Sequence, residues 1–327
     1  MIRFEVSADD LLRSRFALSP LFEVQSLLRH LEGLDQPRLP WAARLRPAFS
    51  RLRRETELDV LLALLSPRYG PGFVVPPPRG LAQTIEDDLE AVRATPLSVV
   101  RAEIAEALRR SPASSEATLK ALRRKDIAER MAIVLELAWR ELVAPDWPHL
   151  RAICERDVIF RSSELGRAGW AAALAGLHPR VRWHDDGIEI SKFTPPRAIA
   201  LGGHGILFVP SVFTWPKVAV YTEDPWPKAI AYPARGIASL WEPPQAVPGA
   251  LADLLGRSRA RLLIALAEPA STTQLARLTH LAIGSVNDHL RVLERAGLLS
   301  RARAGHAVLY RRTPLGEVIA GIEKMRG

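Results

Sequence analysis

Residues 258–313 have the pattern of a helix, a tight turn, a second helix and a basic β-hairpin, in that order. We expect Ser271 to cap the first helix of the motif and Gln274, three residues later, to reach back and close a capping box. The second helix has apolar residues at helical spacing, which predicts one buried face: Ile283, Val286, Leu290 and Leu293. Gly297 follows, where a left-handed residue commonly ends a helix. The order of these elements predicts a winged helix-turn-helix, whose second helix fits the major groove of DNA.

Polar and basic side chains fall where such a motif would contact DNA. At 100° per residue, several of these residues lie on or beside the groove-facing side of the second helix, and others lie on the hairpin. The predicted DNA-binding residues are Thr272, Ser285, Asn287, Asp288, His289, Arg291, Arg295, Arg301, Arg303, His306 and Arg311. Asn287 fits adenine, Asp288 fits the cytosine amino group, and Arg291 fits guanine or phosphate. The hairpin arginines, Arg312 among them, would bind phosphate. The alternative is that these charges are only solvated.

The net charge of the chain is concentrated near its end. Residues 250–327 carry 12 Lys and Arg against 6 Asp and Glu, whereas the first 249 residues carry 33 against 30. Binding to the DNA backbone depends on such a local excess of positive charge, because each neutralised phosphate releases counterions. The distribution therefore favours double-stranded DNA as the partner of the C-terminal region.

Residues 283–298, I-G-S-V-N-D-H-L-R-V-L-E-R-A-G-L, resemble the recognition helix of ArsR-type regulators, S-x-x-V-S-x-H-L-x-x-L-x-x-A-G-L. Asn287 and Ile283 depart from that pattern, so the base preferences of the family do not carry over. Metal-sensing members place paired cysteines on the helix that corresponds to residues 272–279. This chain has none there, which excludes thiolate metal sensing at that site. No metal and no cofactor is expected.

The resemblance extends beyond this helix, to residues 203–215, 232–242 and 251–263. These segments are similar to bacterial regulators that join a long, poorly understood N-terminal domain to a C-terminal ArsR-type winged helix. The resemblance implies transcriptional regulation and a homodimer formed by terminal helices, but it names no effector. The final helix, from Pro314, has an apolar stripe that would have to be covered by its own domain or by a second chain: Leu315, Val318, Ile319 and Ile322.

The first 245 residues predict a larger α/β domain. After a short strand at residues 1–6, apolar residues recur at helical spacing as far as about residue 178, and strand patterns fill about 180–242. The predicted helices span residues 8–15, 19–32, 40–53, 56–65, 81–94, 96–110, 116–143 and 147–176. A proline-rich stretch, residues 67–78, is expected to be a loop or arm without packed structure. The predicted fold is multidomain α/β: a mainly helical region with one antiparallel or mixed sheet (residues 1–245), then the winged helix-turn-helix (residues 250–327).

Aromatic residues of the predicted sheet lie near Gly202-Gly203-His204-Gly205, and glycines allow a ligand to approach the backbone closely. The candidate effector pocket consists of Trp183, His204, Phe208, Trp215 and Tyr232. The alternative is that these side chains form the core of the sheet. The sequence thus predicts a transcriptional repressor that is relieved by a small molecule. The second hypothesis makes the N-terminal domain a protein-interaction or dimerisation module without a ligand.

An enzymatic N-terminal domain is a third hypothesis, but the chain lacks the nucleophile-elbow, Walker, zinc-protease and dinucleotide motifs. We therefore predict no catalytic residues. The single cysteine, Cys154, lies among apolar helical positions, which predicts a buried thiol. The first ten residues hold no signal sequence, and the uncharged stretch 198–216 has the glycines and β-branched residues of buried strands. These features predict a cytoplasmic, nucleoid-associated protein with no membrane contact.

Overall fold

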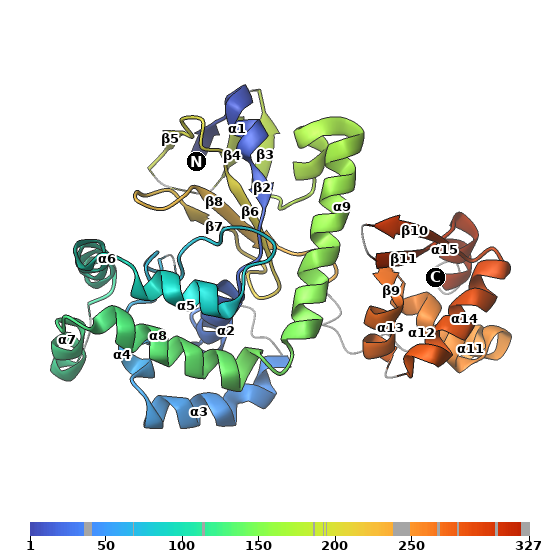
Figure 1. Cartoon of the computed structure of the whole chain (residues 1–327), viewed down its shortest axis with the longest axis horizontal. Helices are drawn as coiled ribbons and strands as arrows, with labels where there is room; N and C mark the ends of the chain where they lie inside the picture. The colour runs from blue at the N-terminus through green and yellow to red at the C-terminus, as the bar shows by residue number, and fades with distance from the viewer. Residues whose placement is uncertain are drawn as a thin grey trace. The chain divides into compact units, whose positions relative to one another are not determined.

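The computed structural model describes residues 1–35, 41–67, 69–112, 115–185, 187–191, 193, 195–237, 249–266, 269–279, 281–304 and 307–321. The chain divides into two compact units, Met1–Ile237 and Ala238–Gly327. Both mix helices with small sheets (Figure 1). Each unit is described by itself.

The first sheet of the N-terminal unit is built around the start of the chain. Its strand order is β3-β4-β1-β5, so β1 (Ile2–Glu5) is an interior strand. The predicted hairpin is present as β3 (Val181–His184) and β4 (Gly187–Ile190), although Asp186 of its turn lies outside the described residues. β1 runs antiparallel to β4 and parallel to β5 (Arg197–Ala200). The predicted strand at residues 1–6 is confirmed, and it pairs with residues almost 190 positions away.

A second sheet has the order β2-β6-β8-β7. Its parallel strands are β2 (Arg15–Phe16), β6 (Leu207–Ser211) and β8 (Ala229–Pro233), and β7 (Ala219–Tyr221) is antiparallel at the edge. The expectation of a single sheet over residues 180–242 is therefore wrong. The two short strands β1 and β2 each join a different set of strands from residues 181–233. Pairing between residues so far apart in the sequence leaves no signal in local periodicity.

The predicted helices are present, most of them with shorter bounds, although the helix predicted at residues 40–53 starts later and ends two residues later, at Glu55. In chain order they are α1 (Ala8–Arg13), α2 (Pro20–Glu32), a 3-10 turn (Trp41–Leu45), α3 (Arg46–Glu55), α4 (Leu58–Leu62), α5 (Ile85–Arg93), α6 (Leu97–Arg110), α7 (Glu116–Leu122), α8 (Ile127–Ala138), a π turn (Trp139–Val143) and α9 (Trp147–Leu174). The single helix expected over residues 116–143 is thus interrupted. Arg101 donates hydrogen bonds to the carbonyl oxygens of Leu122 and Arg123 (both 2.6 Å), which satisfies the end of α7 and stops it there.

The proline-rich segment is a loop, as predicted, but it is packed into the core. Phe73, Val74 and Val75 are almost completely buried. Glu103 Oε2 accepts a hydrogen bond from the backbone N–H of Phe73 (2.7 Å), and the Tyr221 hydroxyl donates to the carbonyl of Val75 (2.9 Å). The expectation of an unpacked arm is wrong because side chains from distant elements satisfy the backbone of this segment.

The C-terminal unit contains five helices and a three-stranded sheet among its described residues. The helices are α11 (Gly249–Leu255), α12 (Arg257–Ala265), α13 (Thr272–Thr279), α14 (Ile283–Arg295) and α15 (Pro314–Ala320). The strands are β9 (Ala270–Ser271), β10 (Leu299–Ala304) and β11 (Ala307–Arg312), paired antiparallel in the order β10-β11-β9. Buried apolar residues from α12, α13, α14 and the sheet form one core, which includes Leu263, Leu275, Leu290 and Tyr310.

Candidate nucleic-acid interface

Local hydrogen bonds define the start of α13. The Ser271 N–H donates to Gln274 Oε1 (2.7 Å), and the Gln274 N–H donates back to Ser271 Oγ (3.3 Å). This reciprocal pair is the predicted capping box. At the other end, the Thr279 hydroxyl donates to the Leu275 carbonyl (2.7 Å), and Arg261 donates to the Thr279 carbonyl (2.8 Å). The following residue, His280, lies outside the described residues. Both ends of α13 are therefore satisfied by side chains.

α14 has one buried face, which consists of Val286, Leu290 and Leu293. Ile283, which the sequence pattern placed on the same face, is 51% exposed because it starts the helix beyond the edge of the core. The helix ends at Gly297, whose φ of 71° is left-handed as predicted, and the Leu298 N–H donates to the Leu293 carbonyl (3.0 Å). These contacts fix which side of α14 faces solvent.

The exposed side of α14 carries the polar residues that the helical wheel places there. Ser285, Asp288, Arg291 and Arg295 are exposed, whereas Asn287 and His289 are half-buried on the flanks. Arg291 lies 3.9 Å from the carboxylate of Asp288, and both side chains are about three-quarters exposed. A solvent-screened pair of this kind contributes little to stability, so both groups remain accessible to a ligand.

The hairpin β10–β11 contributes further basic side chains. Arg301 is exposed and forms an ion pair with Glu294 of α14 (3.1 Å). Arg311 is also exposed, and its Nε donates to Ser300 Oγ (3.1 Å). The side chain of Arg303, and the whole of His306, lie outside the described residues. The Arg301–Glu294 pair connects the hairpin to α14.

Arg312 does not belong to the exposed charge of the hairpin, which corrects the expectation that it binds phosphate. Its side chain is only 10% exposed. It donates to the carbonyl oxygens of Leu263 and Ile264 (both 2.7 Å), in the last turn of α12, and pairs with Glu317 (3.0 Å). An arginine placed at a helix C-terminus satisfies free carbonyls and interacts favourably with the helix dipole. Arg312 therefore has a structural role that charge counting could not reveal.

The last described helix, α15, begins as predicted, with Thr313 Oγ1 accepting from the Gly316 N–H (3.1 Å) and Pro314 in the first turn. Ile319 packs against the core of the unit. Leu315 and Val318 are 52% and 60% exposed, and Ile322 lies outside the described residues. The predicted apolar stripe is thus only partly covered by its own domain.

The structure does not bring the five candidate effector residues together. Phe208 and Tyr232 are buried in the second sheet, where Phe208 packs against the Trp170 ring (5.4 Å between centroids). Trp183 lies on β3 of the first sheet, and His204 is exposed on a turn. Trp215 is 39% exposed and lines a cavity of about 440 Å³.

The glycines next to His204 approach another part of the chain. A Cβ at Gly205 would meet the backbone of Arg13 and Ser14 (2.7 Å), and the Gly205 N–H donates to Asp10 Oδ1 (3.0 Å). The expected close approach therefore exists, but it is to α1 and the residue after it.

The cavity at Trp215 is formed by the chain segment after α9 and by residues next to β4, β6 and β8. Its lining includes Leu177, His178, Arg180, Pro216 and Pro233. His178 Nε2 lies 3.1 Å from the Pro216 carbonyl, and burial lowers the pKa of this histidine. An uncharged histidine can donate one hydrogen bond to that carbonyl and accept another at Nδ1, which takes the Arg180 N–H (3.0 Å). Both ring nitrogens of His178 therefore already have partners within the protein.

A buried glutamate joins several elements of the N-terminal unit. Glu23 in α2 accepts from the N–H groups of Val212 (2.7 Å) and Phe213 (3.2 Å) and from the Ser211 hydroxyl (3.1 Å). Burial raises the pKa of Glu23 to about 7, while these donors oppose the shift. Cys154 contacts Glu23 Oε1 at 3.7 Å and is buried, as predicted, and burial raises the pKa of its thiol. These groups join α2, α9 and the residues after β6, without access to solvent.

In α9, Asp157 pairs with the buried Arg161 (2.9 Å) and accepts from the Tyr232 hydroxyl (2.7 Å). Tyr232 is thereby tied to a helix, and it is not available to a ligand. The hydrogen bonds among these three residues give partners to polar groups that burial has removed from water.

In a comparison with known protein families, residues 76–238 match a family described as a family of unknown function (DUF5937). No curated protein and no solved structure matches the chain. Among the described residues, no group of three or more His, Cys, Asp or Glu side chains is arranged to hold a metal ion. None of the helices in the described ranges has both the length and the apolar composition needed to cross a membrane.

Proposed function

We propose that this protein is a sequence-specific, DNA-binding transcriptional regulator and that residues 250–327 are its winged helix-turn-helix domain. α13 and α14 would form the helix-turn-helix, and the β10–β11 hairpin would be the wing. The observation that carries the proposal is the division of α14 into two faces. Val286, Leu290 and Leu293 are buried on one side, and polar or basic side chains are exposed on the other.

The chemistry of the exposed side supports direct contact with DNA. Arg291 and Arg295 project from α14, and Arg301 and Arg311 are exposed on the hairpin. Arginine binds guanine and phosphate with two parallel hydrogen bonds, so it suits both the groove and the backbone. We assign base contacts to α14 and phosphate contacts to the hairpin, as a winged motif would divide them. The resemblance of residues 283–298 to ArsR-type recognition helices agrees with this assignment.

We further propose that the regulator is a homodimeric repressor and that the N-terminal unit controls it. Two copies would bind related half-sites, because a single small helix-turn-helix offers a limited interface. The exposed Leu315 and Val318 of α15 support contact with a second copy. Control by a small molecule remains the first hypothesis for the N-terminal unit, and control by a protein partner is the second.

Selection from a random pool of double-stranded DNA by the purified full-length protein tests the proposal. We expect a defined motif to be enriched, with two-fold symmetry if the protein binds as a dimer. Arg291→Ala combined with Arg295→Ala should abolish enrichment. A matched control is Arg109→Ala combined with Arg140→Ala, since both side chains are exposed on the N-terminal unit. A pool that stays random with the unaltered protein contradicts the proposed function.

A further inference from the structure

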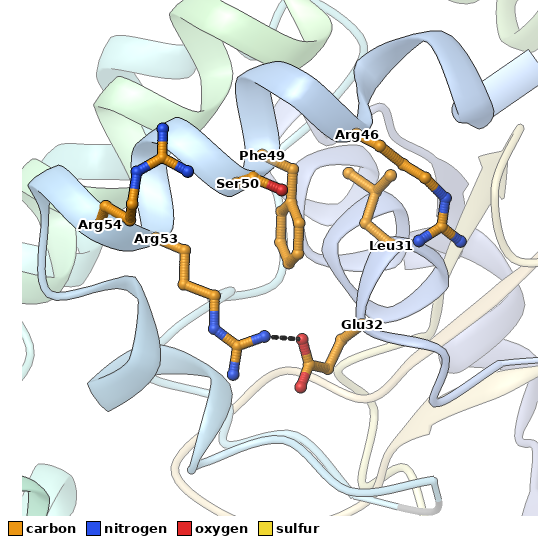
Figure 2. Close-up of a pocket in the computed structure, with 7 residues that line it drawn as sticks. All are labelled: Leu31, Glu32, Arg46, Phe49, Ser50, Arg53 and Arg54. Atoms are coloured by element: carbon orange, nitrogen blue, oxygen red, sulfur yellow. Dashed lines mark hydrogen bonds and ion pairs between the residues drawn. The ribbon is translucent and has the colours of Figure 1, made fainter.

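A cavity of about 460 Å³ lies beside α3 in the N-terminal unit. α3 contributes residues at helical spacing along one of its faces, and the end of α2 supplies the opposite wall (Figure 2). The lining residues are Leu31, Glu32, Arg46, Phe49, Ser50, Arg53 and Arg54. Three arginines and one glutamate therefore line a hollow that is large enough for a small organic molecule.

The arginines of this region differ in how they are neutralised. Arg44 pairs with Asp146 and Arg51 pairs with Glu141, both at 2.6 Å, so these two are bound to carboxylates outside the cavity. Within the described residues, the side chains of Arg46 and Arg54 form neither a hydrogen bond nor an ion pair. α3 also has no acidic residue in its first turn, where Arg46 lies. The cavity therefore keeps positive charge that the fold does not neutralise.

Arg53 is held in place by carboxylates on two sides. Its Nη1 donates to Glu32 (2.9 Å) and its Nε donates to Asp59 (2.5 Å). Figure 2 shows the Arg53–Glu32 pair below the Phe49 ring and Arg46 to the right of the ring, beyond Leu31. The pair positions the guanidinium of Arg53, whereas Arg46 has its full set of donors available for a ligand.

The remaining walls are suited to an organic group. Phe49 and Leu31 line the cavity between the charged groups with only a small exposed edge each (6% and 4%), and Ser50 adds an exposed hydroxyl. An inorganic ion would leave most of a 460 Å³ cavity unfilled. A planar carboxylate or a phosphate suits the donor geometry of arginine, and an attached ring can lie against Phe49.

We propose that this cavity binds a small organic anion, with its carboxylate or phosphate held by Arg46 and its apolar part against Leu31 and Phe49. If the chain is a DNA-binding regulator, as proposed above, this anion is its effector. That regulatory consequence rests on the proposed function, but the binding site does not. Glu32 competes with the ligand for the positive charge, so it sets the affinity of the cavity for anions.

Calorimetric titration of the full-length protein, without DNA, tests the site. Benzoate and phenyl phosphate are the probes, and benzyl alcohol and inorganic phosphate are their neutral and inorganic counterparts. We expect saturable binding of at least one organic anion, and much weaker binding of both counterparts. Arg46→Ala should weaken binding by about tenfold or more, because its charge-assisted hydrogen bonds to the anion are lost. Arg51→Ala, which removes equal charge from the same helix outside the cavity, should leave it unchanged.

Glu32→Gln separates a binding role from a structural one. Removal of the competing carboxylate should tighten the binding of the organic anion, whereas damage to the fold would weaken it. No saturable binding of either anion, equal binding of benzyl alcohol, or equal loss in Arg46→Ala and Arg51→Ala would overturn the site. Equally tight binding of inorganic phosphate would overturn the organic part of the proposal. DNA affinity at a saturating concentration of the anion is then measured separately, and no change there overturns only its role as effector.

Discussion

Thr272 donates a hydrogen bond from Oγ1 to Oδ1 of Asn287, across 3.2 Å, so the first residue of α13 holds a side chain of α14. The amide of Asn287 is thereby oriented before any ligand arrives. Its Oδ1 retains a second lone pair, and its Nδ2 group remains a donor. These are the two functions that an asparagine needs in order to read adenine.

Replacement of Asn287 by alanine should therefore change which DNA is preferred. We expect a loss of about 1–3 kcal/mol on the preferred sequence and relaxed discrimination at one base pair. Thr272→Val, which keeps the shape and removes the hydroxyl, should cause a smaller loss at the same base pair. Competition binding against a series of single-base variants measures both. An equal loss on every sequence would show that Asn287 only positions the helix.

The salt dependence of DNA binding should identify the phosphate contacts. Each phosphate contact made by an arginine releases about 0.9 counterion, so Arg301→Ala combined with Arg311→Ala should reduce the slope of log affinity against log salt by about 1–2. The preferred sequence should not change. The control is again Arg109→Ala combined with Arg140→Ala. If the hairpin variant keeps the original slope, the phosphate contacts lie elsewhere.

Gly316 has no room for a side chain. A Cβ at this position would overlap the carbonyl oxygen of Leu298, a backbone atom that cannot turn away. We expect Gly316→Ala to destabilise the C-terminal unit by about 1–3 kcal/mol through overpacking. Gly284→Ala is the matched control: its Cβ would meet nothing within 4 Å, so it should stabilise α14 by about 0.5–1 kcal/mol. Hydrogen exchange of β10 and α15 in the full-length protein measures the difference. Similar exchange rates in the two variants would contradict this packing.

Glu23 should make the stability of the N-terminal unit depend on pH. Its pKa is raised from 4.5 to about 7 in the folded state, so the folded protein binds this proton more tightly than the unfolded chain does. The contribution to the free energy of unfolding is therefore most favourable below about pH 4.5, and it decreases by about 3 kcal/mol as the pH rises to 7.

Glu23→Gln removes that titration. The stability of the unaltered protein relative to this variant should fall between pH 4.5 and 7.5, as measured by urea unfolding. Glu116→Gln, at an exposed position, should show no such trend. A pH-independent difference between the unaltered protein and Glu23→Gln would mean that Glu23 is ionised throughout this range.

The exposed apolar residues of α15 should determine the oligomeric state. Leu315→Ser combined with Val318→Ser should convert a dimer to a monomer in sedimentation experiments at micromolar concentration. Leu254→Ser, at a 66% exposed position of α11, should not. A full-length protein that is monomeric, yet binds a single half-site specifically, would exclude the dimer.

Short-range signals in the sequence were reliable guides to local structure. The capping box of Ser271 and Gln274 and the left-handed Gly297 involve residues within a few positions of one another. The same is true of Thr313, which caps α15. In each case the geometry depends on a side chain and its neighbouring backbone, so the residue types alone define it. The two faces of α14 follow similarly from the spacing of its apolar residues.

Local sequence patterns could not show whether the candidate effector residues line a pocket or form a core. Aromatic character and nearby glycines are equally compatible with a pocket and with a core, and only the packing placed Phe208 and Tyr232 inside the second sheet. The cavity beside α3 had no distinguishing signal, because charged residues at helical spacing usually indicate a solvated face. The arginines that line it could be told apart from their neighbours only once the carboxylate partners of Arg44 and Arg51 were known.

The sequence by itself determined most of the helices, the caps at Ser271, Gly297 and Thr313, the hairpin at the C-terminus and the exposed side of α14, since these depend on contacts between near neighbours. Tertiary structure alone decided that β1 and β2 enter two different sheets, that the segment from Phe73 to Val75 is buried, and that Arg312 binds the end of α12. Those outcomes join residues that are tens to almost 200 positions apart. Such contacts form because burial and hydrogen bonding across the whole chain favour them, and no local pattern encodes which distant partner a residue will meet.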